Sequence, residues 1–580
     1  MGKYKKPLVK ISNLSKIFEI QNIYALKSIN VEFYPGKIIG LVGPDGAGKT
    51  TLIRIMAGLL KPTHGNVEIL GNDTIQQSKN IYQLISYMPQ KFGLYEDLTV
   101  LQNLNLYADL QNISKKSRED IFEKLLHFTN LKSFTKRLAK NLSGGMKQKL
   151  GLACTLLRKP QFLLLDEPSV GVDPISRREL WKMVLALSKE NISILWSTAY
   201  LDEAEKCQEV LLLNKGGLLY FGPPEILTNK MKERVFQIQN ISENRRSVLS
   251  KALKDEATID GIIQGNSVRI VLKPTLKTLD ISKFNPGKDA ILKTISPRFE
   301  DAFIDILGGG PKKASPLLKL IPPIKKEKEI VLEVIGLKKC FGDFTAVDQI
   351  NFSVKRGEIF GLLGPNGAGK STTFKMLCGL LKPTQGDAYI VGLSIKKVTS
   401  QARARIGYMA QKFSLYENMT VVQNMNFFSG IYPIPNIKRK NIVNKLITIF
   451  DLSKFINTKA SKLPLGFKQR LALSCAIMHN PEVLFLDEPT SGVDPITRRE
   501  FWNHINGMVE KGISVIITTH FMDEAEYCDR IGLINKGQLI IIGTPDELKN
   551  SVASKDLPSP TLEDAFIIFS KKEKKDVTKI

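Results

Sequence analysis

The chain has 580 residues, of which 43% are apolar, and its formal net charge is +26 at pH 7. That length predicts two or more globular domains, and that apolar content excludes a disordered chain. No apolar run approaches the roughly 18 residues of a membrane-spanning helix, and the N-terminal MGKYKKPLVK lacks the apolar stretch of a signal peptide and the pattern for myristoylation.

Neither the net charge nor the cysteine pattern indicates a specialised class of protein. The basic residues are spread along the chain, which favours a solvated surface over a nucleic-acid groove, and proximity to an anionic membrane is a second use for this charge. The six cysteines show no CxxC spacing, so we expect neither a disulfide framework nor a zinc site. The histidines outside the motifs below have no metal-like spacing, and we expect surface or packing roles for them.

The chain contains an internal repeat. GPDGAGKTT (43–51) recurs as GPNGAGKST (364–372), and LLLDEPSVGVDP (163–174) recurs as LFLDEPTSGVDP (484–495), each 321 positions later. A constant interval means that the loops between the motifs have equal lengths. We therefore predict two domains of one fold, over residues 1–235 and 330–550.

Each repeat carries the pattern G-x-x-x-x-G-K-[ST] between an apolar run and a helical pattern, which is the strand–loop–helix context of a phosphate loop. Its glycines let backbone N–H groups converge on phosphate oxygens, and its lysine neutralises the phosphates. The predicted ATP-binding residues are Gly43, Pro44, Asp45, Gly46, Ala47, Gly48, Lys49, Thr50 and Thr51, and Gly364, Pro365, Asn366, Gly367, Ala368, Gly369, Lys370, Ser371 and Thr372.

The apolar strands FLLLDE and VLFLDE each end in a pair of acids. We expect Asp166 and Asp487, with the hydroxyls of Thr50 and Ser371, to hold Mg²⁺. Glu167 and Glu488 would polarise the water that attacks the phosphate.

The segment that follows the first repeat is longer than the segment that follows the second repeat. PRFEDAFI (297–304) recurs as PTLEDAFI (560–567) after only 263 positions, so the first repeat carries about 58 extra residues between roughly 235 and 296. SVRIVL alternates like a strand and RRSVLSKAL has the pattern of a helix, which predicts a small α+β insert. We assign residues 236–307 to this accessory domain, 308–329 to an extended Gly- and Pro-rich linker, and 551–580 to a C-terminal tail.

The ordered set of phosphate loop, Gln in MPQ or MAQ, LSGG, LLLDEP and TTH resembles the ATP-binding cassette (ABC) ATPases, most closely the YbhF-type twin-cassette subunits of bacterial ABC-2 class exporters. The resemblance implies an α/β fold with two P-loop domains, each a RecA-like core with a helical and an antiparallel β subdomain. It implies head-to-tail pairing, in which the LSGG motif of one cassette caps the ATP held by the other. Further residues implied by the resemblance are Gln90 and Gln411 at Mg²⁺, Ser143, Gly144 and Gly145 at the γ-phosphate opposite Lys370, His520 as the switch histidine, and Phe18 and Phe341 against adenine.

The two repeats differ at two of these positions. LSGGMKQK (142–149) becomes LPLGFKQR (463–470), where Pro464 lacks both a hydroxyl and an N–H donor, and Leu465 adds bulk. Ala199 stands where the second repeat has His520. In a head-to-tail pair both losses fall on the site built around Lys49. We therefore expect one hydrolytic site and one that mainly binds ATP, while LPLGFKQR still starts a helix.

The resemblance implies a transport motor that works separate membrane permease subunits of ABC-2 type from the cytoplasmic face of the inner membrane, with no specific nucleic acid. Tyr95 and Tyr416 are then candidate contacts to those subunits. Soluble twin-cassette ATPases of ribosomes (ABC-F factors) are the alternative, but they usually keep both LSGG motifs and have a charged helical linker, whereas this linker is Pro-rich. A fused sugar-importer ATPase is a third option, disfavoured by the complete second phosphate loop.

Overall fold

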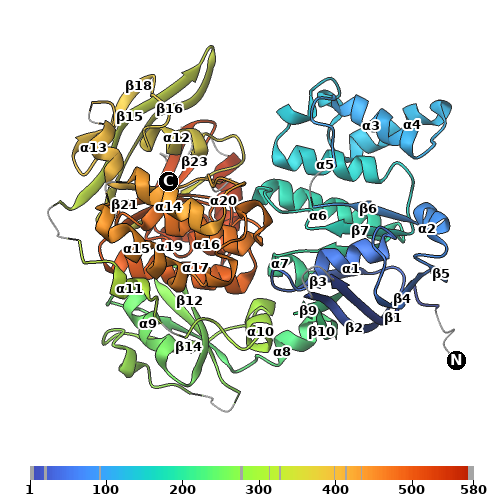
Figure 1. The fold of residues 1–580 in the computed structure, drawn as a ribbon, viewed down its shortest axis with the longest axis horizontal. Helices are drawn as coiled ribbons and strands as arrows, with labels where there is room; N and C mark the ends of the chain where they lie inside the picture. Colours follow the sequence, from blue (N-terminus) through green and yellow to red (C-terminus); the bar gives the residue numbers. More distant parts are fainter. Residues whose placement is uncertain are drawn as a thin grey trace. The chain divides into compact units, whose positions relative to one another are not determined.

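The computed structural model describes residues 6–18, 23–90, 93–274, 278–312, 314–324, 328–397, 399–411, 414–432 and 434–571 (Figure 1). Backbone contacts divide the chain into two compact units, one of residues 1–232 with 297–307 and one of 233–296 with 308–580. We call residues 6–232 the first half, 233–296 the insert, 308–329 the connector and 330–571 the second half. Across the described ranges no helix is long and apolar enough to cross a membrane.

The first half is built on a six-stranded sheet in the order β10-β9-β3-β8-β7-β6, which is parallel except for β10. Its strands are β10 (Gly217–Gly222), β9 (Glu209–Asn214), β3 (Ile38–Val42), β8 (Ser193–Ser197), β7 (Phe162–Asp166) and β6 (Ile85–Met88). Every residue of β3, β7 and β8 is buried, as expected for parallel strands covered on both faces. The helices that accompany the sheet are α1 (Lys49–Met56), α2 (Ser78–Leu84), α6 (Pro174–Lys189), α7 (Leu201–Ala204) and α8 (Pro224–Asn229).

Two smaller parts complete the first half. An antiparallel sheet has the order β2-β1-β4-β5, with strands β2 (Ile23–Phe33), β1 (Val9–Phe18), β4 (His64–Ile69) and β5 (Asn72–Asp73). Three helices share a separate apolar core, namely α3 (Val100–Leu110), α4 (Lys115–Phe128) and α5 (Gly144–Thr155). Figure 1 shows these helices clustered away from the antiparallel sheet.

The second half repeats this architecture, which confirms the shared α/β fold. Its six-stranded sheet runs β20 (Ile406–Met409), β21 (Val483–Asp487), β22 (Ser514–Thr518), β17 (Ile359–Leu363), β23 (Arg530–Asn535) and β24 (Gln538–Gly543). Its antiparallel sheet runs β16 (Phe344–Lys355), β15 (Ile330–Phe341), β18 (Gln385–Ile390) and β19 (Leu393–Ser394). Its helices are α12 (Lys370–Leu377), α13 (Thr399–Ala404), α14 (Val421–Ile431), α15 (Asn436–Ile449), α16 (Leu465–Ile477), α17 (Pro495–Glu510), α18 (Met522–Ala525), α19 (Pro545–Asn550) and α20 (Leu562–Lys571).

The insert is a small α+β element, as predicted. Its antiparallel sheet has the order β12-β13-β11-β14, with strands β12 (Thr258–Gln264), β13 (Ser267–Leu272), β11 (Val235–Gln239) and β14 (Ile291–Thr294). The predicted strand SVRIVL is β13 and the predicted helix is α9 (Arg245–Lys254), which packs on β12 and β13.

The two copies of the EDAF motif form equivalent helices, each packed on its own half. Helix α10 (Phe299–Ile306) contacts α7 and α8, and α20 contacts α19 and β23. Helix α10, which the sequence-based limits placed in the accessory domain, thus packs with the first half, while the insert belongs to the unit of the second half. The domain limits drawn from the sequence stay a proposal.

The connector differs from the extended linker expected from its composition. Residues 314–324 include helix α11 (Leu317–Leu320), which packs on α17. Leu317 is fully buried, and Ser315 Oγ lies 2.8 Å from His504 Nδ1. Apolar side chains between the prolines anchor this stretch to the second half. Residues 313 and 325–327 of the predicted linker, and 572–580 of the predicted tail, lie outside the described residues.

Ion pairs hold the insert on the second half. Asp529 accepts hydrogen bonds from Arg245 Nη2 at 2.8 Å and Arg246 Nη2 at 2.6 Å, both on α9. Its Oδ2 also accepts from Ile359 N at 2.8 Å, at the start of β17. In the first half Gln208 makes the equivalent bond to Ile38 N at 2.7 Å. A glutamine satisfies the strand but cannot pair with two guanidiniums, so the repeat differs where the insert docks.

We predict that Asp529→Gln detaches the insert without unfolding the second half, because Gln can keep the strand bond while Arg245 and Arg246 lose their carboxylate. The loss of one partner of a buried ion pair costs about 3–5 kcal/mol, and we expect roughly 2–4 kcal/mol here because the pair is partly exposed. Hydrogen exchange of α9 measures this local opening.

Gln208→Asn is the matched control, since it weakens the strand bond of the first half and leaves the insert's exchange unchanged. Unaltered protection of α9 in Asp529→Gln would contradict the docking role of the ion pairs.

Candidate functional site

Each half contains a phosphate loop followed by a helix whose N-terminus has no side-chain cap. Gly48 and Gly369 precede α1 and α12 with φ values of 104° and 106°. A Cβ at Gly48 would lie 2.4 Å from Ala25 O, and one at Gly369 would lie 2.6 Å from Ala346 O. Glycine is therefore required by both the backbone conformation and the close approach. The first N–H groups of both helices stay directed at the loop, which suits an anion.

The lysines of both phosphate loops are buried within the curved backbone of the loop. Lys49 Nζ donates to Gly43 O at 2.8 Å, and Lys370 Nζ donates to Gly364 O at 2.6 Å. Each ammonium group thus lies beside the same backbone turn whose N–H groups converge. This arrangement of N–H groups around one buried cation suits the β- and γ-phosphates of a nucleotide.

The predicted metal ligands are adjacent to the loop lysines. Thr50 Oγ1 donates to Asp166 Oδ1 at 3.2 Å, and Asp166 Oδ2 is buried with no hydrogen-bond partner in the described part of the chain. In the second half Asp487 Oδ1 accepts from Thr518 Oγ1 at 2.5 Å, and Ser371 directly follows the loop lysine. Burial raises the pKa of both aspartates. Hydroxyl and carboxylate oxygens with an unsatisfied acceptor fit a hard divalent cation.

The two glutamates that follow lie in a strained conformation. Glu167 and Glu488 directly follow β7 and β21 and have φ values of 50° and 47°, in the left-handed region. Gln90 Nε2 donates to Glu167 Oε2 at 2.6 Å, and Gln411 Nε2 donates to Glu488 Oε2 at 2.9 Å. Such strain persists where the surroundings hold a side chain for a function. Here it aims each carboxylate back toward its own phosphate loop.

The halves differ beside these glutamates, as the sequence predicts. His520 Nδ1 lies 3.2 Å from Glu488 Oε2, while its Nε2 is buried and has no partner among the described residues. In the first half Ala199 occupies the equivalent position, and Lys49 Nζ lies 3.8 Å from Glu167 Oε1. Only the second half therefore offers an imidazole nitrogen to a phosphate.

This difference reverses the pKa shift of the two glutamates. Burial raises the pKa of Glu167, and the opposing effects of Lys49 and Gln90 do not overcome it. Burial also acts on Glu488, but its interaction and hydrogen bond with His520, together with Lys370, outweigh burial and lower its pKa. The surroundings of Glu488 therefore favour its ionised form, whereas burial disfavours the ionised form of Glu167.

Thr518 is a site residue that the sequence analysis missed. It donates to Asp487 Oδ1 and accepts from the Glu488 backbone N at 3.0 Å, so one hydroxyl holds both acids of the second half. The first half has Ser197, whose Oγ is buried and makes no hydrogen bond to a described residue. The signal that could have identified it is the Thr518-to-Ser197 difference between ITTH and WSTA, two residues before the His520-to-Ala199 difference.

The LSGG segments start helices in both halves, which confirms the prediction for LPLGFKQR. Ser143 caps α5 and accepts from Met146 N at 3.3 Å, whereas Pro464 precedes α16 without a side-chain cap. The retained glycine has a packing reason, because a Cβ at Gly145 would lie 2.6 Å from Ser176 Cβ. The presence of Gly145 is therefore not by itself evidence for phosphate binding.

The two predicted adenine-stacking rings are exposed. Phe18 is 42% exposed at the end of β1, and Phe341 is 50% exposed at the end of β15. Lys16 and Lys339 lie over these rings, at 5.5 and 5.0 Å from their centroids. The rings are available for contact rather than part of the core, and adenine stacking stays a prediction.

The histidines outside the motifs pack against their surroundings where they are buried. His479 stacks on Tyr432 with ring centroids 3.8 Å apart, and burial lowers its pKa to about 4. Burial likewise lowers the pKa of His504, the partner of Ser315, to about 4. The described residues contain no cluster of metal-ligating side chains of the histidine, cysteine or carboxylate kind, and all six cysteines are free.

Comparison with known proteins identifies relatives of the whole chain. The ABC transporter family profile matches residues 26–170 and 347–491. The probable multidrug ABC transporter ATP-binding protein YbhF of Escherichia coli strain K12 is 54% identical over 97% of this chain and 97% of its own. The linearmycin resistance ATP-binding protein LnrL of Bacillus subtilis strain 168 is 36% identical over 41% of this chain and 78% of its own. The Nod factor export ATP-binding protein I of Ralstonia nicotianae is 37% identical over 38% of this chain and 68% of its own.

We predict that His520→Ala shifts the acid limb of ATP turnover to higher pH. A base works when ionised, and without the histidine burial dominates and raises the pKa of Glu488. The measurement is the residual rate against pH, normalised to its own plateau. In the control Ala199→His, the acid limb of the pH profile should stay in place if the first half contributes little turnover. An unshifted acid limb in His520→Ala would show that His520 does not lower the pKa of Glu488.

Proposed function

Because this chain belongs to the family of ATP-binding proteins of ABC transporters, which bind and hydrolyse ATP, we propose that it is the motor subunit of an exporter with one hydrolytic and one binding ATP site. The observation that carries this proposal is the contrast between His520 beside Glu488 and Ala199 near Glu167. The relatives named above, whose names refer to multidrug transport, resistance and export, support transport out of the cell.

At the proposed hydrolytic site each residue of the second half has a defined task. Lys370 and the N-terminus of α12 bind the phosphates, and Glu488 accepts the proton of the attacking water. His520 Nε2 lies ready to donate to the γ-phosphate once the ring is correctly protonated. Ser371, Asp487 and Gln411 would hold Mg²⁺, which when bound neutralises charge on the phosphate oxygens.

We propose that the halves pair head to tail, so that Ser143, Gly144 and Gly145 cap the ATP at Lys370, and Pro464 and Leu465 face the ATP at Lys49. A serine hydroxyl and close-approaching backbone can bind an anion, whereas proline and leucine offer neither. The weakened cap and Ala199 then meet at one ATP, which is held by Lys49, Thr50, Asp166, Glu167 and Gln90. Two losses at one composite site support specialisation of that site for binding.

The proposed partners are integral membrane subunits of ABC-2 type, met at the cytoplasmic face of the inner membrane. Tyr416 is 46% exposed and contacts Phe427 with ring centroids 4.5 Å apart, and Ile431 nearby on α14 is 61% exposed. Tyr95 of the first half is 54% exposed. Exposed aromatic and aliphatic side chains favour a protein contact. The segments predicted to make this contact also include Lys91, Phe92, Lys412 and Phe413, which lie outside the described residues.

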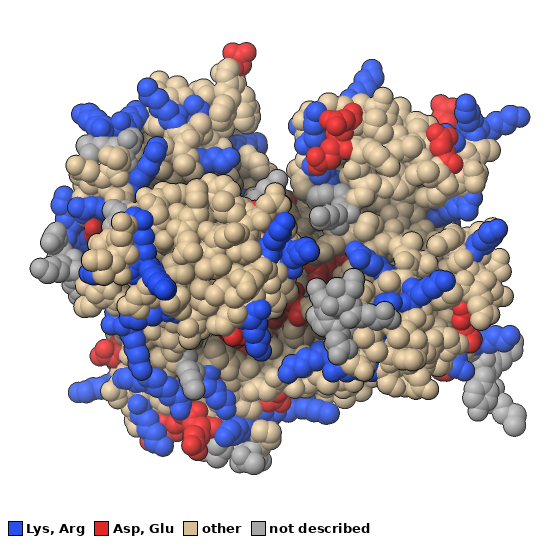
Figure 2. Space-filling model, viewed as in Figure 1, with Lys and Arg blue, Asp and Glu red and all other residues tan. Residues whose placement is uncertain are grey.

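The surface charge favours this assignment over a nucleic-acid role. On the face shown in Figure 2 lysines and arginines are scattered and interspersed with acids rather than gathered in one stripe. A scattered charge lacks the electrostatic footprint of a nucleic-acid groove.

The matched substitutions Glu488→Gln and Glu167→Gln test the asymmetry. We expect Glu488→Gln to lower ATP turnover by roughly 10²–10⁴-fold, the usual contribution of a general base. Glu167→Gln should lower it by less than about tenfold. Both variants keep the shape of the side chain, and binding of a fluorescent ATP analogue verifies that each still binds nucleotide. Equal losses in the two variants would exclude one dominant site.

Affinity purification of Glu488→Gln from gently solubilised cells, in the presence of ATP, tests the motor role. We expect integral membrane proteins in stoichiometric amount, because trapped ATP holds the halves closed. Tyr416→Ser should reduce their recovery while ATP binding persists. Recovery of ribosomes in place of membrane proteins would overturn the transport proposal.

A further inference from the structure

A cavity lies where the insert, the connector and the second half meet. Its volume is about 530 Å³, within the range of small-molecule sites. Its lining includes Arg246 from α9, Lys328 from the connector, and Arg356 and Lys511 from the second half. We call it the junction cavity.

Two of the lining arginines each share a carboxylate with a second arginine. Arg246 shares Asp529 with Arg245, and Arg356 shares Glu482 with Arg405, at N–O distances of 2.6 to 2.9 Å. Each of these two carboxylates therefore holds two guanidiniums, and Glu510 is a further acid beside Arg246. Burial lowers the pKa of Arg245, which reflects the cost of holding such charge away from water. Additional negative charge near either pair of arginines would be stabilised.

The same arginines keep unused hydrogen-bond donors. The Arg246 residue is 6% exposed and the Arg356 side chain 7% exposed. Arg246 Nε and Arg356 Nη1 are buried and make no hydrogen bond to any described residue. Arg246 Nη2 donates to Asp529, and Arg356 Nε and Nη2 donate to Lys328 O and Glu482. Both arginines line the cavity and are held in place by carboxylates, and guanidinium groups fixed in this way are well suited to binding phosphate.

Other parts of the wall complete the chemistry. Asn244, which caps the N-terminus of α9, lines the cavity, so the positive end of that helix dipole faces it. Ile324 and Val509 supply apolar surface for the organic part of a ligand. Two acids, Glu329 and Glu510, also line it; Glu329 Oε1 lies 3.4 Å from Lys355 Nζ. Burial raises the pKa of Glu510 despite the opposing charges of Arg246, Lys254 and Lys511, so Glu510 is the acid best able to take up a proton there.

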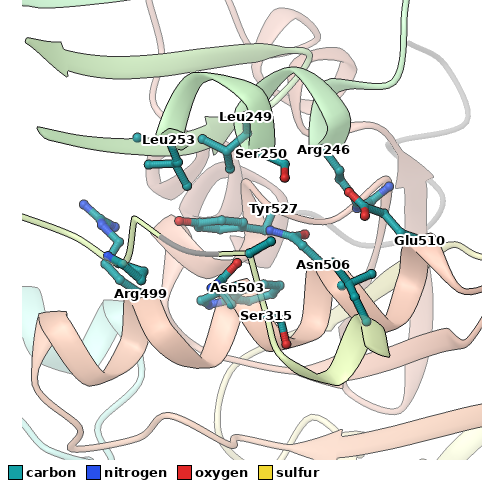
Figure 3. A pocket seen from close by; sticks show the side chains of 16 residues that line it. Arg246, Leu249, Ser250, Leu253, Ser315, Arg499, Asn503, Asn506, Glu510 and Tyr527 are labelled. Atoms are coloured by element: carbon teal, nitrogen blue, oxygen red, sulfur yellow. The ribbon is translucent and has the colours of Figure 1, made fainter. Parts of the chain in front are cut away.

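Figure 3 shows a narrower crevice between α9 and α17 that shares Arg246 and Glu510 with the junction cavity, and these two side chains lie next to each other at one end of it. Its volume is only about 30 Å³, enough for water but not for an organic molecule. Because this crevice is so narrow, α9 packs closely against α17. The insert is therefore docked on the second half where it forms a wall of the junction cavity.

The internal repeat provides a comparison within the chain. The positions equivalent to Lys328, Arg356 and Lys511 are Pro7, Pro35 and Glu190. The first half folds the same core without these cations and with an acid at one of the positions. The cations are thus not needed for the fold of this core.

We propose that the junction cavity binds a phosphate monoester, either a small soluble phosphate ester or the phosphate of an anionic lipid headgroup. The ligand bridges the insert and the second half by contacting Arg246 on one side and Arg356 and Lys511 on the other. Such binding stabilises the docked insert, because the ligand binds only where all three segments meet.

The test uses the full chain with both ATP sites saturated by a non-hydrolysable ATP analogue and Mg²⁺. Glycerol 3-phosphate is titrated calorimetrically, and binding to phosphatidylcholine vesicles is compared with and without phosphatidic acid. We expect one bound phosphate ester per chain, or phosphatidic-acid-dependent vesicle binding, and at least a tenfold weaker affinity in Lys511→Glu. Glycerol 3-phosphate binding alone identifies a soluble ester, and vesicle binding that needs phosphatidic acid identifies a lipid headgroup.

Lys511→Glu is the decisive variant because the first half tolerates Glu190 at the equivalent position. Arg246→Gln should weaken binding as well, although it also removes one docking ion pair. Lys189→Glu changes the same charge at the exposed position of the first half equivalent to Glu510, and should leave binding unchanged. Absence of binding to both probes, or equal binding by Lys511→Glu, would overturn the proposal. ATP turnover is measured separately, so that failure would leave the motor role intact.

Discussion

The structure depends on the burial of a carboxylate pair at the end of a parallel strand. Asp166 with Glu167, and Asp487 with Glu488, are almost completely buried, which is unfavourable for ionised acids. Each half must therefore supply cations and hydrogen-bond donors around the pair. The phosphate loop supplies the lysine, and the segment after β6 or β20 supplies the glutamine. In the second half β22 and the residues after it also supply the Thr518 hydroxyl and an imidazole. The fold is arranged to bring these groups to one sheet edge.

Small changes in that surrounding shell give the two halves different chemistry on one scaffold. His520 and Thr518 hold the acids of the second half, and Ala199 and Ser197 leave those of the first half with fewer partners. The consequence is a lowered pKa for Glu488 and a raised pKa for Glu167. Because the backbone is the same in both, the difference arises from side-chain electrostatics alone and needs no change of fold.

The same logic explains where the insert docks. Asp529 performs the strand-capping task of Gln208 and in addition receives Arg245 and Arg246. Asp529 lies nine residues after His520 in the sequence. It also accepts from Ile359 N at the start of β17, the strand that leads into the second phosphate loop. The insert is thus attached to the elements that carry the more complete set of catalytic groups, and the cations left over at that junction form the wall of the junction cavity.

The sequence by itself determined the fold class, the repeat, both phosphate loops, the acidic strand ends and the loss of a histidine at position 199, because each depends on a short contiguous pattern with its own local geometry. It also located the insert and its main helix and strand. Only the tertiary structure decided which half receives the insert, the packing of the connector, the role of Thr518, the opposite pKa shifts and the junction cavity. These depend on burial and on partners far apart in the chain, such as Arg245 and Asp529, separated by 284 positions, which no local pattern encodes.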